Sequence, residues 1–329
     1  MPQGPEAPDL DDVLAARERL GRYLPPTPLY RYPALSDLVG AEVWVKHENH
    51  QPVGAFKVRG GINLVSQLSV VERERGVVAA STGNHGQSVA YAAGIFGVRA
   101  TICVPERANP VKVAAISSLG AEVVPHGRDF DEAREHCERL AATEGYRYIH
   151  SGDEPLLIAG VATHTVEILE KGQGIEVIVV PVGGGSGAAG ACIAAKAIRP
   201  DVEVIAVQSE AAPAAYRAWR ERRLVEDRME TFAEGLATRV AFELPQRILW
   251  RLLDDFVLVS DREIRDAMVA MIAGTRNLIE AAGAAPLAAA LKLRPRLAGR
   301  HVALIASGGN VSIEQLRDLL EDRRMERQG

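Results

Sequence analysis

Short runs of β-branched residues alternate with amphipathic or alanine-rich stretches along most of the chain, and this alternation restricts the folds open to it. The runs are apolar at nearly every position, which is typical of strands buried on both faces. The predicted strands are Val77–Ala80, Ala100–Val104, Ala121–Val124, Val177–Val182, Val204–Val207, Phe256–Val259 and Val302–Ala306. Because single helical stretches separate them, the sequence predicts an α/β fold with open parallel sheets and flanking helices.

The length of the chain allows two such sheets. It has 329 residues, of which 47% are hydrophobic, enough to bury more than one core. Residues 51–145 contain roughly three strand–helix units, which suffice for a small domain. We therefore predict a small domain at 51–145 and a large domain formed by 1–50 together with 146–329.

Composition excludes several classes of protein. The net charge of -5 argues against a nucleic-acid binder, and the longest apolar runs are too short to cross a bilayer. The N-terminus is acidic and proline-rich, unlike a signal peptide. Cys103, Cys137 and Cys192 are widely spaced without a CxxC pair, as expected of reduced thiols. We expect a cytoplasmic protein with no nucleic-acid or membrane partner.

A glycine-rich segment, GGGSGAAG, runs from Gly183 to Gly190 directly after a predicted strand. Such glycines let backbone N–H groups turn inward at a helix N-terminus, where they bind anions. Residues Gly185–Gly190 also spell GxGxxG, with Glu210 about twenty residues later, which is the pattern of a nicotinamide-dinucleotide site. The density of glycine suits a compact terminal phosphate better. The segment alone leaves both ligands open, as well as a plain turn needed for close packing.

The segment STGNHGQS also lies between a predicted strand and a predicted helix. Ser81, Thr82 and Asn84 offer side-chain donors, and the amides of Gly83–Gly86 lie at a helix start, which suits a carboxylate. The alternative is a simple helix cap by Ser81 or Thr82.

Lys57 opens a predicted helix just after an Ala-Phe pair. Positive charge is disfavoured near a helix N-terminus, so we expect a lowered pKa for this lysine. A neutral amine is the form that makes a Schiff base. A lysine taken in isolation is usually a surface residue, so a catalytic role for Lys57 depends on the other motifs of the chain.

Four motifs together carry a family resemblance. In chain order they are GAFKVRG at Gly54–Gly60, STGNHGQ at Ser81–Gln87, VPVGGGSG at Val180–Gly187 and SGGN at Ser307–Asn310. They resemble the Schiff-base lysine segment, the SxGNHAQ loop, the tetraglycine phosphate loop and the SGGN segment of the tryptophan-synthase-β-like, or fold-type-II, pyridoxal-phosphate enzymes. Within that group the chain is most similar to the threonine/serine dehydratase and serine racemase branch. The resemblance implies two open parallel-sheet domains with the cofactor, pyridoxal 5'-phosphate, in the cleft between them.

The resemblance also implies roles for individual residues. Those expected at the cofactor are Lys57 as the Schiff-base lysine, Phe56 beside the ring, Asn84 at the ring hydroxyl, Gly183, Gly184, Gly185, Ser186 and Gly187 at the phosphate, Ser307 at the pyridine nitrogen, and Glu280 nearby. Those expected at the substrate carboxylate are Ser81, Thr82, Gly83 and His85. Lys57 would exchange the Cα proton, and Thr82 occupies the place of the second acid–base serine of racemases.

The implied activity is that of a dehydratase, an ammonia-lyase that converts a small L-β-hydroxy amino acid such as threonine or serine to a 2-oxo acid and ammonia. A racemase or a β-replacement synthase would use the same cofactor site. More distant alternatives are a nicotinamide-dependent oxidoreductase using Gly185–Gly190 and a non-enzymatic metabolite sensor. By analogy with the group, we expect a homodimer.

The chain departs from the branch at two places. Gln208 and Ala214 stand where an acidic pair usually supports a divalent ion, and hard cations prefer clustered carboxylates, so we predict no metal. The segment HSGDEP differs from the HPFD-like form common in threonine dehydratases. Gly152 replaces its bulky side chain, so the sequence predicts a wider substrate pocket.

Overall fold

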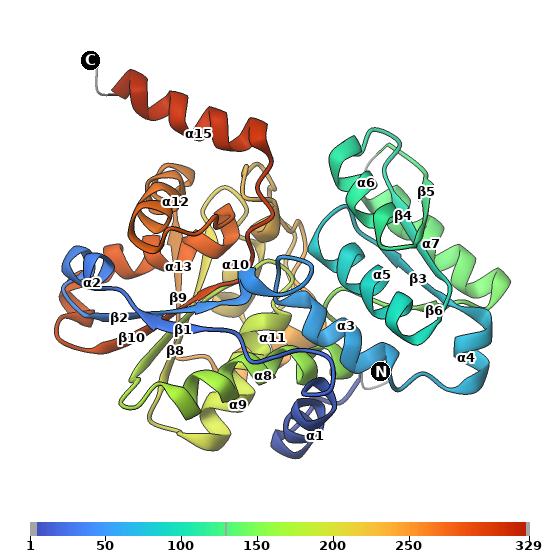
Figure 1. Cartoon of the computed structure of the whole chain (residues 1–329), viewed down its shortest axis with the longest axis horizontal. Coiled ribbons are helices and arrows are strands. Elements are labelled where there is room, and N and C mark those ends of the chain that lie inside the picture. The colour runs from blue at the N-terminus through green and yellow to red at the C-terminus, as the bar shows by residue number, and fades with distance from the viewer. Residues whose placement is uncertain (1–4, 129, 327–329) are drawn as a thin grey trace.

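The computed structural model describes residues 5–128 and 130–326, and in this part of the chain the strands form two separate sheets (Figure 1). The six-stranded sheet has the order β1 (Leu29–Arg31), β2 (Glu42–His47), β10 (His301–Ala306), β7 (Val177–Pro181), β8 (Glu203–Ser209) and β9 (Asp255–Val259). The four-stranded sheet has the order β5 (Glu122–Pro125), β4 (Ala100–Val104), β3 (Val77–Ala80) and β6 (Arg147–Tyr148). The predicted α/β fold with two open sheets is confirmed.

Neighbouring strands run parallel throughout the described part, except that β1 pairs antiparallel with β2 at an edge. The seven strands expected from the sequence lie within one or two residues of their predicted limits. The larger sheet takes strands from both ends of the chain, and the smaller takes strands from 77 to 148. Strand β6 of the smaller sheet lies just beyond the predicted limit at residue 145. The domain limits at 51 and 145 stay predictions.

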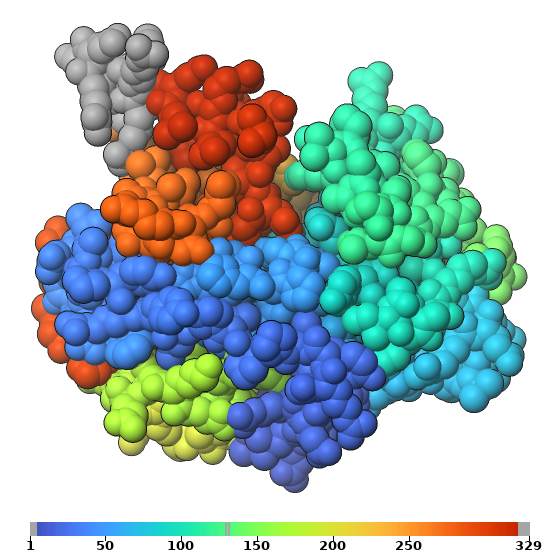
Figure 2. Space-filling view, viewed as in Figure 1, coloured from blue at the N-terminus to red at the C-terminus, as the bar shows by residue number. Residues whose placement is uncertain are grey.

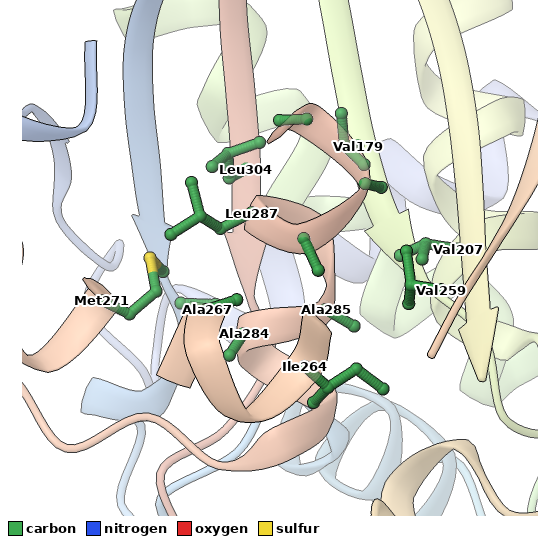
Figure 3. Packing of buried hydrophobic residues seen from close by; sticks show 14 of the residues in the cluster. Val179, Val207, Val259, Ile264, Ala267, Met271, Ala284, Ala285, Leu287 and Leu304 are labelled. Atoms are coloured by element: carbon green, nitrogen blue, oxygen red, sulfur yellow. The ribbon is translucent and has the colours of Figure 1, made fainter. Parts of the chain in front are cut away.

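Helices cover both faces of the larger sheet. Against one face pack α2 (Pro33–Val39), α12 (Asp261–Thr275), α13 (Ala281–Lys292) and α14 (Arg294–Leu297). Figure 3 shows Leu287 of α13 directed at Leu304 of β10, with Met271 and Ile264 of α12 below it in this view. Against the other face pack α8 (Pro155–Lys171), α9 (Ser186–Ile198), α10 (Ala214–Glu221) and α11 (Glu243–Leu252), with α1 (Leu10–Leu20) lying on α8.

The smaller sheet is also covered on both faces. On one side lie α3 (Lys57–Val65), α5 (Asn84–Phe96) and α6 (Pro110–Ser118), and on the other α7 (Phe130–Glu144). The other described helical segments are η1 (Glu48–His50), α4 (Val70–Arg75), η2 (Glu234–Leu236) and α15 (Ile313–Glu326). No helix in the described part is both long and apolar enough to pass through a membrane.

The two sheets form two lobes, which a groove separates on the face seen in Figure 2. Three candidate segments begin where parallel strands end. Residues 81–83 follow β3, residues 182–185 follow β7, and residues 307–310 follow β10. In open α/β sheets ligands bind beyond the carboxyl ends of the strands. The fold therefore places the sequence motifs where a ligand site is expected.

Candidate active site

Lys57 is the first residue of α3, directly after Phe56 at the N-cap. The segment before it is tied to the end of β10, because the Phe56 N–H donates to the Ser307 carbonyl at 2.9 Å. The Lys57 amine, Nζ, donates to the Ser151 carbonyl at 2.7 Å and to Ser186 Oγ at 2.9 Å. Loss of hydration lowers the pKa of Lys57 to about 8. A large fraction of this amine is therefore neutral near pH 8.

The glycine loop approaches other backbone segments too closely for side chains. A Cβ at Gly183 would lie 3.2 Å from the carbonyl carbon of Gly235 and closer still to its oxygen. Gly185 has φ +90°, which favours glycine. Ser186, almost fully buried, begins α9, so the free N–H groups of that helix face the loop. A loop of this geometry beside the Lys57 amine is suited to bind an anion.

Asn84 and Glu280 meet where the two lobes touch. The Asn84 amide donates to Glu280 Oε1 at 2.9 Å and accepts from Asn310 at 2.7 Å. Burial raises the pKa of Glu280 to about 7. Glu280 precedes α13, and a Cβ at Gly308 would lie 2.5 Å from its carboxylate. These contacts join α5, α13 and the SGGN segment in one hydrogen-bonded group.

The loop after β3 places its donors at the start of α5. The Gly83 N–H donates to Ser81 Oγ at 3.1 Å, and Ser81, Thr82 and Gly83 are all partly exposed. The ring of His85 is buried, with Nε2 3.1 Å from the Ile149 carbonyl. Burial, aided by the charge of Lys57, lowers the pKa of His85 to about 3, so its ring is neutral. This geometry favours the backbone N–H of His85, rather than its ring, as a donor to a substrate.

Gln208, which stands at the expected metal position, is fully buried. Its amide accepts from the Tyr216 N–H at 3.1 Å, which holds the first turn of α10, and donates to the Leu236 carbonyl. Among residues 5–128 and 130–326, no group of three or more His, Cys, Asp or Glu side chains gathers in a way that could hold a metal ion.

Gly152 does not open the pocket as the sequence predicted. The ring of Phe242, just before α11, fills the space beside it, and a Cβ at Gly152 would lie 3.1 Å from Phe242 Cε2 and closer to Cδ2. The expectation of a wider pocket is wrong because a side chain distant in the sequence replaces the missing one.

Two residues near Lys57 had no signal in the sequence. Ser151 contributes only its carbonyl, which any residue has. Phe242 lies far along the chain from the motifs and reaches the site through the packing of α11. Asn310, by contrast, is the last residue of the SGGN motif, and that motif was its signal.

Comparisons with known proteins identify the family of the chain. Residues 22–308 match the family described as pyridoxal-phosphate dependent enzymes. L-threonine ammonia-lyase of Thermotoga maritima is 38% identical over 93% of this chain and 77% of that protein. L-threo-3-hydroxyaspartate ammonia-lyase of Saccharomyces cerevisiae is 34% identical over 96% of this chain and 97% of that protein.

Solved structures agree as well. Serine racemase of Dictyostelium discoideum has a TM-score of 0.88 and 32% sequence identity, covering 93% of this chain and 99% of that one. The dinucleotide reading of Gly185–Gly190 is thereby set aside, since the family's cofactor is pyridoxal phosphate. Gly190 instead lets α9 pack closely against α8, because a Cβ added at this position would lie 2.9 Å from the Ala162 nitrogen. The chain belongs to the pyridoxal-phosphate-dependent enzyme family.

Proposed function

We propose that the protein is an ammonia-lyase that converts a small L-β-hydroxy amino acid, such as threonine or serine, to a 2-oxo acid and ammonia. The observation that carries this is the position of Lys57, whose partly desolvated amine lies 2.9 Å from Ser186 Oγ at the head of the glycine loop. An amine of lowered pKa beside an anion site is what an aldehyde cofactor with a phosphate group requires.

The residues present fit pyridoxal phosphate. The glycines after β7 leave backbone N–H groups uncovered by side chains, and a Cβ at Gly187 would lie 3.1 Å from the Phe56 ring. When bound, the cofactor supplies an aldehyde that condenses with amines and a conjugated ring that stores electrons released from Cα. We assign its phosphate to Gly183–Gly187 and its ring to the space between Phe56, Asn84 and Ser307.

The chain's own groups divide the remaining work. With cofactor and substrate bound, the Lys57 amine would be the group that accepts the proton from Cα. We propose that Ser81, Thr82, Gly83 and the His85 N–H hold the substrate carboxylate, and that Glu280 and Asn84 orient the ring. Ser307 offers the pyridine nitrogen a neutral hydroxyl, which cannot keep it protonated as an aspartate would. With that neutral partner, the site would suit loss of the β-hydroxyl as water better than transamination.

Racemisation is the second candidate, and one observation favours it. Thr82 places a partly exposed hydroxyl on the carboxylate loop, in the place of the second acid–base serine of racemases. A β-replacement synthase would share every cofactor residue and differ in a second-substrate site.

A product screen tests these functions. The purified enzyme with pyridoxal phosphate is incubated with L- and D-serine, L-threonine, L-threo-3-hydroxyaspartate and L-threo-phenylserine, and 2-oxo acid, ammonia and the enantiomer are measured. We expect equal amounts of 2-oxo acid and ammonia from at least one L-substrate. If the opposite enantiomer of a substrate forms without ammonia, the enzyme is a racemase and not a lyase. If cofactor binds but no substrate releases ammonia, the lyase function is overturned and β-replacement becomes the better proposal.

We also propose that the enzyme acts as a homodimer in the cytoplasm. Ile313 and Leu320 of α15 are 77% and 55% exposed, and α15 projects from the larger lobe (Figure 1). Apolar side chains on a projecting helix are suited to contact with a second subunit. Cys103, Cys137 and Cys192 are buried free thiols, as in a reducing compartment. Light scattering at micromolar concentration tests the dimer, and a monomer mass would contradict it.

A further inference from the structure

The ring of Phe242 lies between two backbone segments that flank the Lys57 amine. A Cβ at Gly184 would lie 2.6 Å from Phe242 Cδ2 and closer still to Cε2. A Cβ at Gly152 would overlap the same ring edge. Ser151, next to Gly152, accepts from the Lys57 amine at 2.7 Å. The ring therefore touches both the glycine loop and the segment that binds the lysine.

The segment under the ring is held firmly. His150 Nδ1 accepts from the N–H groups of Gly152 at 3.1 Å and Asp153 at 2.9 Å. The Asp153 carboxylate accepts from the Leu244 N–H at 2.9 Å, which ties the segment to the start of α11. The His150 ring meets Phe242 edge-on, with centroids 4.6 Å apart. This geometry is typical of a stable aromatic pair.

Phe242 is not a core residue. Its side chain is only partly buried, although two of its contacts are with glycines at which no side chain could fit. An aromatic ring kept partly open beside a reactive amine is suited to contact a ligand. Its partners also explain why residue 152 is a glycine, because any Cβ there would displace the ring.

We propose that Phe242 is the specificity-determining residue of the site. Phe242, at the N-cap of α11, fills the space that a bulky side chain at position 152 would otherwise fill. Its ring limits the substituent on the substrate Cβ to small groups such as hydrogen or methyl. The substrate class is then small aliphatic β-hydroxy amino acids, and aryl substrates such as phenylserine are excluded. This inference rests on the proposed function, and it deepens that function by naming the residue that excludes larger substrates.

Phe242→Ala tests the inference against the matched control Phe96→Ala. Phe96 is also partly buried and pairs edge-on with Tyr23 at 5.2 Å, on the helix α5. Two ratios are measured in the cofactor-loaded enzymes. The first is kcat/KM for L-threo-phenylserine over that for L-serine. The second is the affinity for L-phenylalanine over that for L-alanine. Neither amino acid has a β-leaving group, and the binding of each is followed by the absorbance of the bound cofactor.

We expect Phe242→Ala to raise both ratios by about tenfold or more, as a hydrophobic pocket discriminates by such factors. Phe96→Ala should leave both unchanged. Unchanged ratios in Phe242→Ala would overturn the inference. If that variant does not retain cofactor, Phe242→Leu is used, and unchanged ratios there overturn it equally. Failure of the wild type to release 2-oxo acid would instead overturn the proposed function, since the binding ratio still decides the role of Phe242.

Gly152→Ala supplies an independent check. Alone, it should lower kcat/KM for L-serine, because the new methyl group displaces the Phe242 ring. Combined with Phe242→Ala, the same substitution should cost much less, because the space is free. Equal losses in both backgrounds would show that the ring and position 152 do not share one space, and would overturn the proposal.

Discussion

At the scale of single residues, the site depends on the burial of the Lys57 amine and on the groups that surround it. Its amine has two short hydrogen bonds, to Ser151 and Ser186, and both partners are uncharged. Loss of hydration with no opposing carboxylate is what lowers the pKa of Lys57 to about 8. Burial lowers the pKa of Lys46 as well, but there the acidic partners Glu48 and Glu167 oppose the shift.

The lowered pKa of Lys57 predicts how fast the apoenzyme captures pyridoxal phosphate. The rate constant should rise with pH and level off above about 8, because the neutral, reactive amine then predominates. Stopped-flow absorbance measures it, with Nα-acetyl-lysine as the control. The control has an ordinary lysine pKa near 10.5 and should keep accelerating to higher pH. Apoenzyme that follows the control would contradict the lowered pKa.

Sequence alone predicts site residues that lie in local motifs. Lys57 begins α3, and Asn84 and the glycines after β7 stand at strand–helix junctions, so a few neighbouring residues fix the backbone at each. Phe242 could not be found in this way, because its contact with Gly152 depends on how α11 packs against the β6–α8 connection. For the same reason Gly152 was read as open space.

At the scale of elements, α3 is anchored by a buried charge cluster of Lys46, Glu48, Arg59 and Glu167. Arg59, 2% exposed, donates to Glu48 at 2.7 Å and to Glu167 at 2.7 Å. The positive and negative charges balance, as buried ions require. The cluster links α3 to the end of β2, to η1 and to α8, through Arg59, which lies two residues after Lys57. It therefore fixes the direction from which the lysine enters the site.

Arg59→Met should destabilise the cofactor-loaded protein by about 3–5 kcal/mol, because it leaves buried carboxylates uncompensated. The matched control is Arg17→Met, which removes a pair with Glu170 of α8 whose side chains are 40% and 47% exposed. That change should cost about 1 kcal/mol or less. Urea unfolding followed by circular dichroism measures both. Similar small losses in the two variants would show that the charge cluster does not anchor α3.

The sequence does not predict strands β1, β2 and β6, and the reasons are physical. β1 and β6 contain three and two residues, too few for any periodic pattern to show. β2 reads EVWVKH, in which Lys46 and His47 hide a buried strand because their polar groups find partners inside the protein. Burial of that kind is decided by tertiary contacts and not by local composition.

At the scale of the whole molecule, an ion pair crosses from one lobe to the other. Lys112 of α6 pairs with Glu234 of η2. The η2 segment covers the site, because the Gly235 carbonyl lies against Gly183 and the charges of Lys112 and Glu234 both act on Glu280. The pair is therefore a contact between the smaller lobe and the segment beside the glycine loop.

Lys112→Met should raise KM for L-threonine by no more than about fivefold, because a partly exposed ion pair contributes up to about 1 kcal/mol. The wild type should approach the variant as salt is added, since screening weakens the pair. Lys292→Met is the control, since it breaks a pair with Glu263 inside the larger lobe. Steady-state kinetics from low to high salt test this. A salt-independent difference would contradict the role of the pair.

The central claim is that Lys57 binds the cofactor of an eliminating enzyme, and borohydride reduction tests it most directly. The holoenzyme is reduced, digested and analysed by mass spectrometry of its peptides. We predict a pyridoxyl group on the peptide containing Lys57, with loss of 2-oxo acid release from L-serine or L-threonine. Lys57→Ala should show no labelled peptide. A label on another lysine, such as the buried Lys46, or no label in an active enzyme would contradict the claim.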